Sequence, residues 1–103
     1  MSIKIKFNQI HIDDGRYAIA IKAASLINQF RDMHREMRGG HTNTPTEEAR
    51  LDQVVRECRI IGETAAFFGG YDAMLKLNHA IIDAGGDSNS LGYLWDGIAG
   101  WIQ

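Results

Sequence analysis

The sequence lacks most of the features that mark a disulfide-stabilised, secreted or membrane-spanning protein. It contains one cysteine, Cys58, so no disulfide can form within the chain, and we expect this side chain to be a small buried apolar group. No apolar run approaches the roughly 18 residues of a membrane span. The opening stretch "SIKIKF" alternates polar and apolar residues, which is not the pattern of a signal peptide. We therefore expect a cytoplasmic protein with no membrane partner.

Basic charge is also scarce. The chain has 11 lysine and arginine residues against 13 aspartate and glutamate residues, which gives a formal net charge of −2. A general nucleic-acid-binding protein needs a basic surface, so we do not expect nucleic acid as a partner. A helix-turn-helix is disfavoured too, because the helix predicted at 72–84 carries only Lys76 as a basic residue.

Motifs for catalysis, metal binding and phosphate binding are missing as well. The sequence has no GxSxG, HExxH, paired CxxC or GKS/GKT phosphate loop. His34 and His41 lie on either side of a Gly-Gly pair, and His79 with Asp83 supplies only half of a metal site. We predict no catalytic residue, no metal and no cofactor. The alternative is a small enzyme whose site is shared between subunits, with His34, His41 or His79 as the acid–base group.

What the chain does contain is helical periodicity. Its 103 residues, 45% of them hydrophobic, suit a single folded domain, 1–103. Thr44, Pro45 and Glu47 form the pattern of a capping box with proline at the first helical position. Glycine pairs act as helix stops. The apolar spacing predicts a mainly α fold with about four helices, at 15–38, 45–68, 72–84 and 91–102.

The N-terminal segment has a different period. Ile3, Ile5 and Phe7 alternate with lysines, which predicts a β-strand over about 3–12 with a bulge at Asn8-Gln9. Because the rest of the chain is predicted to be helical, this strand has no partner within its own chain, and an unpaired strand is costly. We expect it to pair across a homo-oligomer interface, with Ile3, Ile5 and Phe7 in that interface, or to add to a sheet of another protein.

Two features near the ends of the chain leave alternatives open. Residues 16–21 can belong to the first helix, or to a hairpin in which "DDG" joins "IHI" to "YAIAI". At the other end, we expect Ser90 to cap a helix that contains Trp95, Trp101 and three costly glycines, which suggests close packing in a groove. That groove belongs to the protein's own fold or to a neighbouring subunit, and in the second case both tryptophans lie in an oligomer or partner interface.

The most suggestive polar cluster follows the first helix. Arg31, Arg35 and Arg38 are spaced to share one helix face, and the loop behind them offers His41 and Asn43. Guanidinium groups donate paired hydrogen bonds to phosphate or carboxylate, so these five residues predict an anion-binding site. The alternative is that the arginines only complement the negative end of the helix dipole.

These observations favour a small, non-catalytic binding module that forms a homo-oligomer and recognises an anionic, nucleotide-like ligand or a protein surface. Phage and mobile-element factors that block or sequester host components include many chains of this kind, which makes such a role one expectation. A second hypothesis is a protein–protein adaptor or inhibitor that uses apolar surfaces alone. Replacing Arg35 and Arg38 by alanine separates the two, because only the first requires these side chains.

Overall fold

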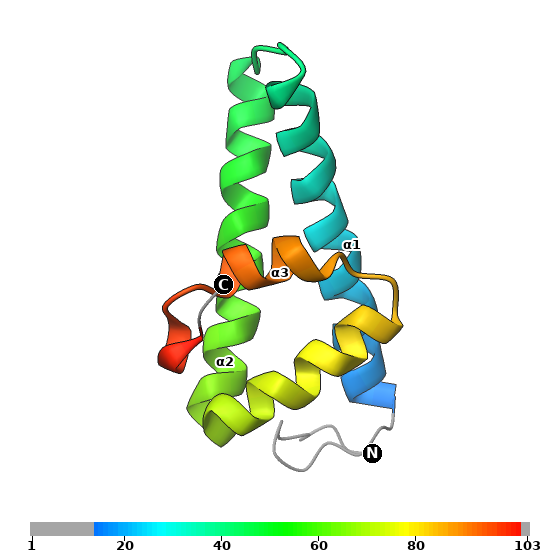
Figure 1. The fold of residues 1–103 in the computed structure, drawn as a ribbon, viewed down its shortest axis with the longest axis vertical. Coiled ribbons are helices and arrows are strands. Elements are labelled where there is room, and N and C mark those ends of the chain that lie inside the picture. The colour runs from blue at the N-terminus through cyan, green and yellow to red at the C-terminus, as the bar shows by residue number, and fades with distance from the viewer. Residues whose placement is uncertain (1–13, 102–103) are drawn as a thin grey trace.

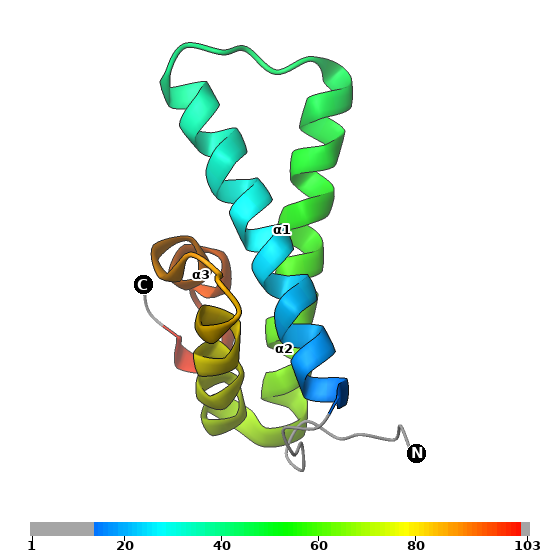
Figure 2. The ribbon, with the colours of Figure 1, turned by 90° about the vertical axis from the view of Figure 1, so that its right-hand side faces the viewer.

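The computed structural model describes the backbone of residues 14–101 and the side chains of residues 18–101. Helix α1 spans Asp14–Arg38, α2 spans Pro45–Asp83 and α3 spans Ser88–Trp95, followed by a single 3-10 turn, η2, at Ile98–Gly100. Helices α1 and α2 lie side by side and antiparallel, and the short α3 crosses them (Figures 1 and 2). The protein is thus mainly α, and residues 14–101 contain no β-strand.

Helix α1 covers the region for which a hairpin was the alternative. Residues 16–21 are helical, so the hairpin through "YAIAI" is wrong. The physical reason is burial at helical spacing: Ala20 lies on the same buried face as Ala23 and Ile27, so this region continues the apolar face of the rest of α1. The strand predicted at 3–12, with Ile3, Ile5 and Phe7, lies outside the described residues.

Helix α2 begins with the predicted capping box. Thr44 Oγ1 accepts a hydrogen bond from the Glu47 backbone N–H at 3.1 Å, and Glu47 Oε1 accepts one from the Thr44 N–H at 2.9 Å. The helices predicted at 45–68 and 72–84 form one element with a sharp bend at Gly70. Gly70 has φ 68° and ψ −159°, a conformation that residues with a β-carbon rarely adopt. The bend turns the last part of α2 back across the molecule (Figure 1).

The C-terminal helix is shorter than predicted. It begins at Ser88 and ends at Trp95, whereas the prediction was 91–102. Its N-cap is Asp87, not Ser90, because the Asp87 carboxylate accepts a hydrogen bond from the Ser90 N–H at 3.0 Å. The chain then turns at Gly97, with φ 90°, where a β-carbon would meet no atom within 4 Å. This glycine therefore permits a turn and does not serve close packing.

Close packing occurs instead at Gly62, in the middle of α2. A β-carbon at Gly62 would lie 2.6 Å from Trp95 Nε1, so the indole ring fits only because Gly62 has no side chain. Trp95 Nε1 also donates a hydrogen bond to the Cys58 carbonyl oxygen at 3.0 Å. Trp95 is 1% exposed, and the Trp101 ring packs edge-on against it and is 8% exposed. Both tryptophans therefore belong to the core of this chain, which corrects their assignment to an oligomer or partner interface.

Cys58 lies in the same core, as the sequence predicted. Burial raises the pKa of its thiol to about 12, with a smaller contribution from the negative charge of Glu57. The thiol is therefore neutral at physiological pH and packs as an apolar group. Among the described helices, none has a stretch both long enough and apolar enough to cross a bilayer.

Candidate anion-binding site

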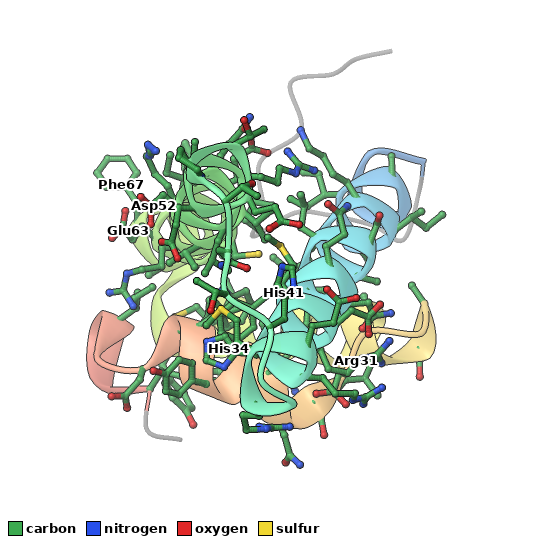
Figure 3. The ribbon with its side chains drawn as sticks, turned by 90° about the horizontal axis from the view of Figure 1, so that it is seen from above. Arg31, His34, His41, Asp52, Glu63 and Phe67 are labelled. Atoms are coloured by element: carbon green, nitrogen blue, oxygen red, sulfur yellow. The ribbon has the colours of Figure 1, made fainter. Side chains whose placement is uncertain are left out.

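A pocket of about 400 Å³ lies between the C-terminal half of α1 and the start of α3. Arg31, Arg35 and Arg38, which the sequence placed on one helix face, all line it. Helix α3 contributes its first turn and Tyr93. Figure 3 shows Arg31 and His34 on the part of α1 near α3, whereas Asp52, Glu63 and Phe67 project from α2 away from this pocket.

The pocket depends on contacts that hold the start of α3 against α1. Asn28 Nδ2 donates a hydrogen bond to the Gly85 carbonyl oxygen at 3.0 Å, and the Asp87 N–H donates one to Asn28 Oδ1 at 3.0 Å. Gly86, between them, is buried, and a β-carbon there would lie 3.3 Å from the Ala24 backbone. One side chain of α1 therefore fixes the turn that brings α3 beside the arginines.

The charges in the pocket do not balance. Arg31 Nε pairs with Asp32 Oδ1 at 3.0 Å. Within the described residues, Arg35 and Arg38 have no ion pair and no side-chain hydrogen bond. Asp87 is the only carboxylate that lines the pocket. The pocket thus carries an excess of positive charge in a chain whose formal net charge is −2.

Asp87 is a structural carboxylate. Its Oδ2 accepts hydrogen bonds from the Ser90 hydroxyl at 2.7 Å and the Ser90 N–H at 3.0 Å. These bonds lower the pKa of Asp87, and the positive charges of Arg31 and Arg35 lower it further. Asp87 is therefore ionised at neutral pH and caps α3.

Aromatic rings form the remaining wall. The Phe30 and Tyr93 rings are stacked with centroids 5.8 Å apart, and the His34 ring lies 4.4 Å from Phe30 and 6.2 Å from Tyr93. Tyr93 is 54% exposed, so much of its ring remains accessible. The sequence prediction missed His34 as a pocket residue, although its spacing from Phe30 and Arg31 places it on the same helix face.

The two loop residues predicted for this site lie elsewhere. His41 Nε2 is 2.9 Å from Glu47 Oε1, and Asn43 Nδ2 donates to Met37 Sδ and to Glu48 Oε2, both at 3.1 Å. Neither His41 nor Asn43 lines the pocket. Their polar atoms hold the loop between α1 and α2, which corrects their assignment as anion ligands.

The loop contacts also shift two pKa values. The hydrogen bond to Glu47 and its negative charge raise the pKa of His41, with a smaller contribution from Glu36. The pKa of Glu47 is lowered mainly by the hydrogen bond from the Thr44 backbone and next by that from His41. This loop is thus stabilised by an ion pair when His41 is protonated.

The described residues contain no cluster of three or more histidine, cysteine, aspartate or glutamate side chains suited to hold a metal ion. Comparison with known proteins finds no family model, no curated protein and no solved structure that matches this chain. Its function must therefore be argued from the chemistry of the site itself.

Proposed function

We propose that this protein is a non-catalytic binding module that takes up a small anionic ligand in the pocket between α1 and α3. The observation that carries the proposal is the pair of arginines, Arg35 and Arg38, whose guanidinium groups line the same pocket as Arg31 and have no ion-pair partner among the described residues. Guanidinium groups bind phosphate and carboxylate through paired, charge-assisted hydrogen bonds. A module that binds without converting its ligand acts by sequestering or sensing it.

The helix dipole does not account for the whole cluster. Arg35 and Arg38 lie in the last turn of α1, where they complement the negative helix end. Arg31 lies before that turn, beyond the short range of the dipole effect, yet it lines the same pocket. The shared position of the three side chains is what a ligand site requires and what a dipole effect leaves unexplained.

Binding is favoured over catalysis by the arrangement of Ser90. This hydroxyl shares the pocket with His34, but it donates its hydrogen bond to Asp87, as part of the cap of α3. A nucleophilic serine requires a hydrogen bond to a base that removes its proton. The hydrogen bond from Ser90 to Asp87 stabilises the fold, and His34 does not serve as a base for Ser90.

The test is calorimetric titration with inorganic pyrophosphate, a small anion that needs only the arginines. We expect the wild type to bind it, and the double variant R35A/R38A to bind it at least about tenfold more weakly, as expected for the loss of charge-assisted hydrogen bonds. R56A is the matched control, because Arg56 is an exposed arginine of α2 that does not line the pocket. Absence of binding to the wild type, or equal binding by R35A/R38A, would contradict the proposal.

A separate observation favours a second function, assembly with another copy of the chain. Phe67, Phe68 and Tyr71 lie beside the bend of α2 at Gly70 and are 82%, 46% and 49% exposed. Exposed aromatic groups are characteristic of interaction surfaces, and a twofold contact brings the same surface of each subunit together. We expect light scattering at micromolar concentration to show a dimer or larger assembly that F67S weakens and I60S, at another exposed position of α2, does not. A monomeric wild type would contradict this function.

A further inference from the structure

A second pocket adjoins the arginine pocket. It has a volume of about 310 Å³ and lies where α1, α2 and α3 meet. Val55 and Arg59 of α2 form one side, and Leu94 with Asp96 at the end of α3 forms another. Phe30 and Tyr93 line both pockets, so the two pockets share this stacked pair of rings.

The chemistry of the second pocket differs from that of the first. Its only basic side chain, Arg59, donates through Nη1 to the Leu94 carbonyl oxygen at 2.9 Å and to the Asp96 carbonyl oxygen at 3.2 Å. These bonds hold the C-terminal end of α3 against α2, so Arg59 has a positioning role. The remaining walls are mainly apolar or aromatic, in contrast with the open arginines of the neighbouring pocket.

A ligand that fills both spaces must therefore be anionic at one end and flat and largely apolar at the other. The accessible Tyr93 ring, supported from behind by Phe30, provides a surface for stacking between the two ends. A nucleoside phosphate has this combination, because its phosphate is a ligand for guanidinium groups and its base stacks on aromatic rings. A phosphate alone, or a sugar phosphate, would leave the second pocket and the ring unused.

On the basis of the proposed anion-binding function, we infer that the ligand is a nucleoside phosphate, with its phosphate at Arg31, Arg35 and Arg38 and its base against Tyr93 in the second pocket. Tyr93 and Val55 are then the residues that select for the base. The arginines bind any small phosphate, and the second pocket distinguishes a nucleotide from other phosphates.

Calorimetric titration with four purine and pyrimidine nucleoside 5′-monophosphates, ribose 5-phosphate and pyrophosphate tests this inference. We expect at least one nucleotide to bind about tenfold or more tightly than ribose 5-phosphate, as base stacking predicts. Y93A should lose this preference for the nucleotide, whereas Y93F, which retains the ring, should keep it.

V55F provides an independent test, because it fills the second pocket and leaves the arginine pocket unchanged. We expect it to bind pyrophosphate as the wild type does and to bind nucleotides no better than ribose 5-phosphate. A circular dichroism spectrum equal to that of the wild type shows that each variant is folded.

The outcomes separate the inference from the function on which it rests. If pyrophosphate, ribose 5-phosphate and the nucleotides bind with equal affinity, the base site is wrong and the anion site stands. If none of them binds, both are wrong. If a 5′-phosphorylated single-stranded oligonucleotide binds more tightly than every mononucleotide, the ligand is a nucleic acid strand and the inference is overturned.

Discussion

The two ends of the α1–α2 pair are stabilised in different ways. Phe30 is the last buried residue of α1 and Val54 is the first of α2, so residues 31–53, here called the arm, contain no buried side chain. The remainder of the described chain, the core end, holds every buried residue and packs α3 against both long helices. In Figure 2 the two helices separate toward the loop that joins them at the end of the arm.

This contrast explains where the candidate site lies. The arm supplies Arg31, Arg35 and Arg38, and the core end supplies Phe30 and Tyr93. Arg35 and Arg38 can remain exposed and without an ion pair because the arm contains no fully buried side chain, whereas the rings and the cap of α3 are held in place by the core. The arginines of the candidate site therefore lie in the arm, apart from the buried residues of the core end.

The largest effect is expected from W95A. It removes the indole that packs on Gly62 and against Trp101, together with the hydrogen bond to the Cys58 carbonyl. We expect the free energy of unfolding to fall by about 3–5 kcal/mol, as for other large aromatic truncations. Urea unfolding measures this change in the free energy of unfolding. R38A in the arm is the control and should change the value by less than about 0.5 kcal/mol. A loss below about 1 kcal/mol for W95A would show that the core end does not depend on this ring.

G62A should have a smaller effect of the same sign. The added methyl group would overlap the Trp95 ring. Overpacking of this kind costs about 1–3 kcal/mol, of which up to about 1 kcal/mol is offset because alanine favours the helix.

The same substitution in a W95F background shows whether the clash is the cause. The smaller ring leaves room for the methyl group, so G62A should there be neutral or stabilising. If G62A destabilises both backgrounds equally in urea unfolding, the contact with Trp95 is not the reason for glycine at this position.

T44A tests whether the arm is stabilised by its cap. The variant loses the hydrogen bond from the Glu47 N–H to Thr44 Oγ1, which should cost about 1 kcal/mol. Because the arm has no fully buried side chain, we expect amide exchange to become faster in the first turns of α2 and to stay unchanged around Cys58 and Trp95. Uniformly faster exchange along the chain would mean that the arm and the core end unfold as one unit.

The smallest effect concerns pH. His41 has a raised pKa, so its contribution to stability is complete below its ordinary pKa of 6.5 and is lost as pH rises through the raised value. Glu47 has a lowered pKa, so its contribution is complete above its ordinary pKa of 4.5 and is lost as pH falls through the lowered value. The ion pair therefore stabilises the arm most between these two ordinary values.

E47Q isolates this pair, because glutamine still serves as the partner in a capping box. We expect the pKa of His41 to fall toward 6.5 in this variant, and NMR titration of the His41 ring measures it directly. The control is E48Q, because Glu48 accepts a hydrogen bond from Asn43 and not from His41. An unchanged pKa for His41 would show that Glu47 does not pair with it in solution.

Much of the candidate site was predictable because it depends on helical spacing. Arg31, Arg35 and Arg38 share a face in any α-helix, so their position on one face needed no knowledge of the tertiary structure. The same helical spacing also places His34 on this face. The wall that α3 contributes to the pocket could not be predicted, because nothing local in "DSNS" or at Tyr93 indicates that α3 crosses α1. His41 and Asn43 were assigned to the site since they follow the arginines in sequence, but their nearest polar partners are Glu47 and Glu48 across the loop.

The capping box, the helical spans of α1 and the two parts of α2, and the break at the glycine pair all follow from the sequence, because each depends on backbone conformation and on neighbours within a few residues. Three features depend on the packing of the whole chain: α3 ends at Trp95, Gly62 makes room for the Trp95 ring, and Tyr93 lines the same pocket as the arginines. Those features depend on contacts between residues far apart in the chain, where packing and not local preference selects the conformation.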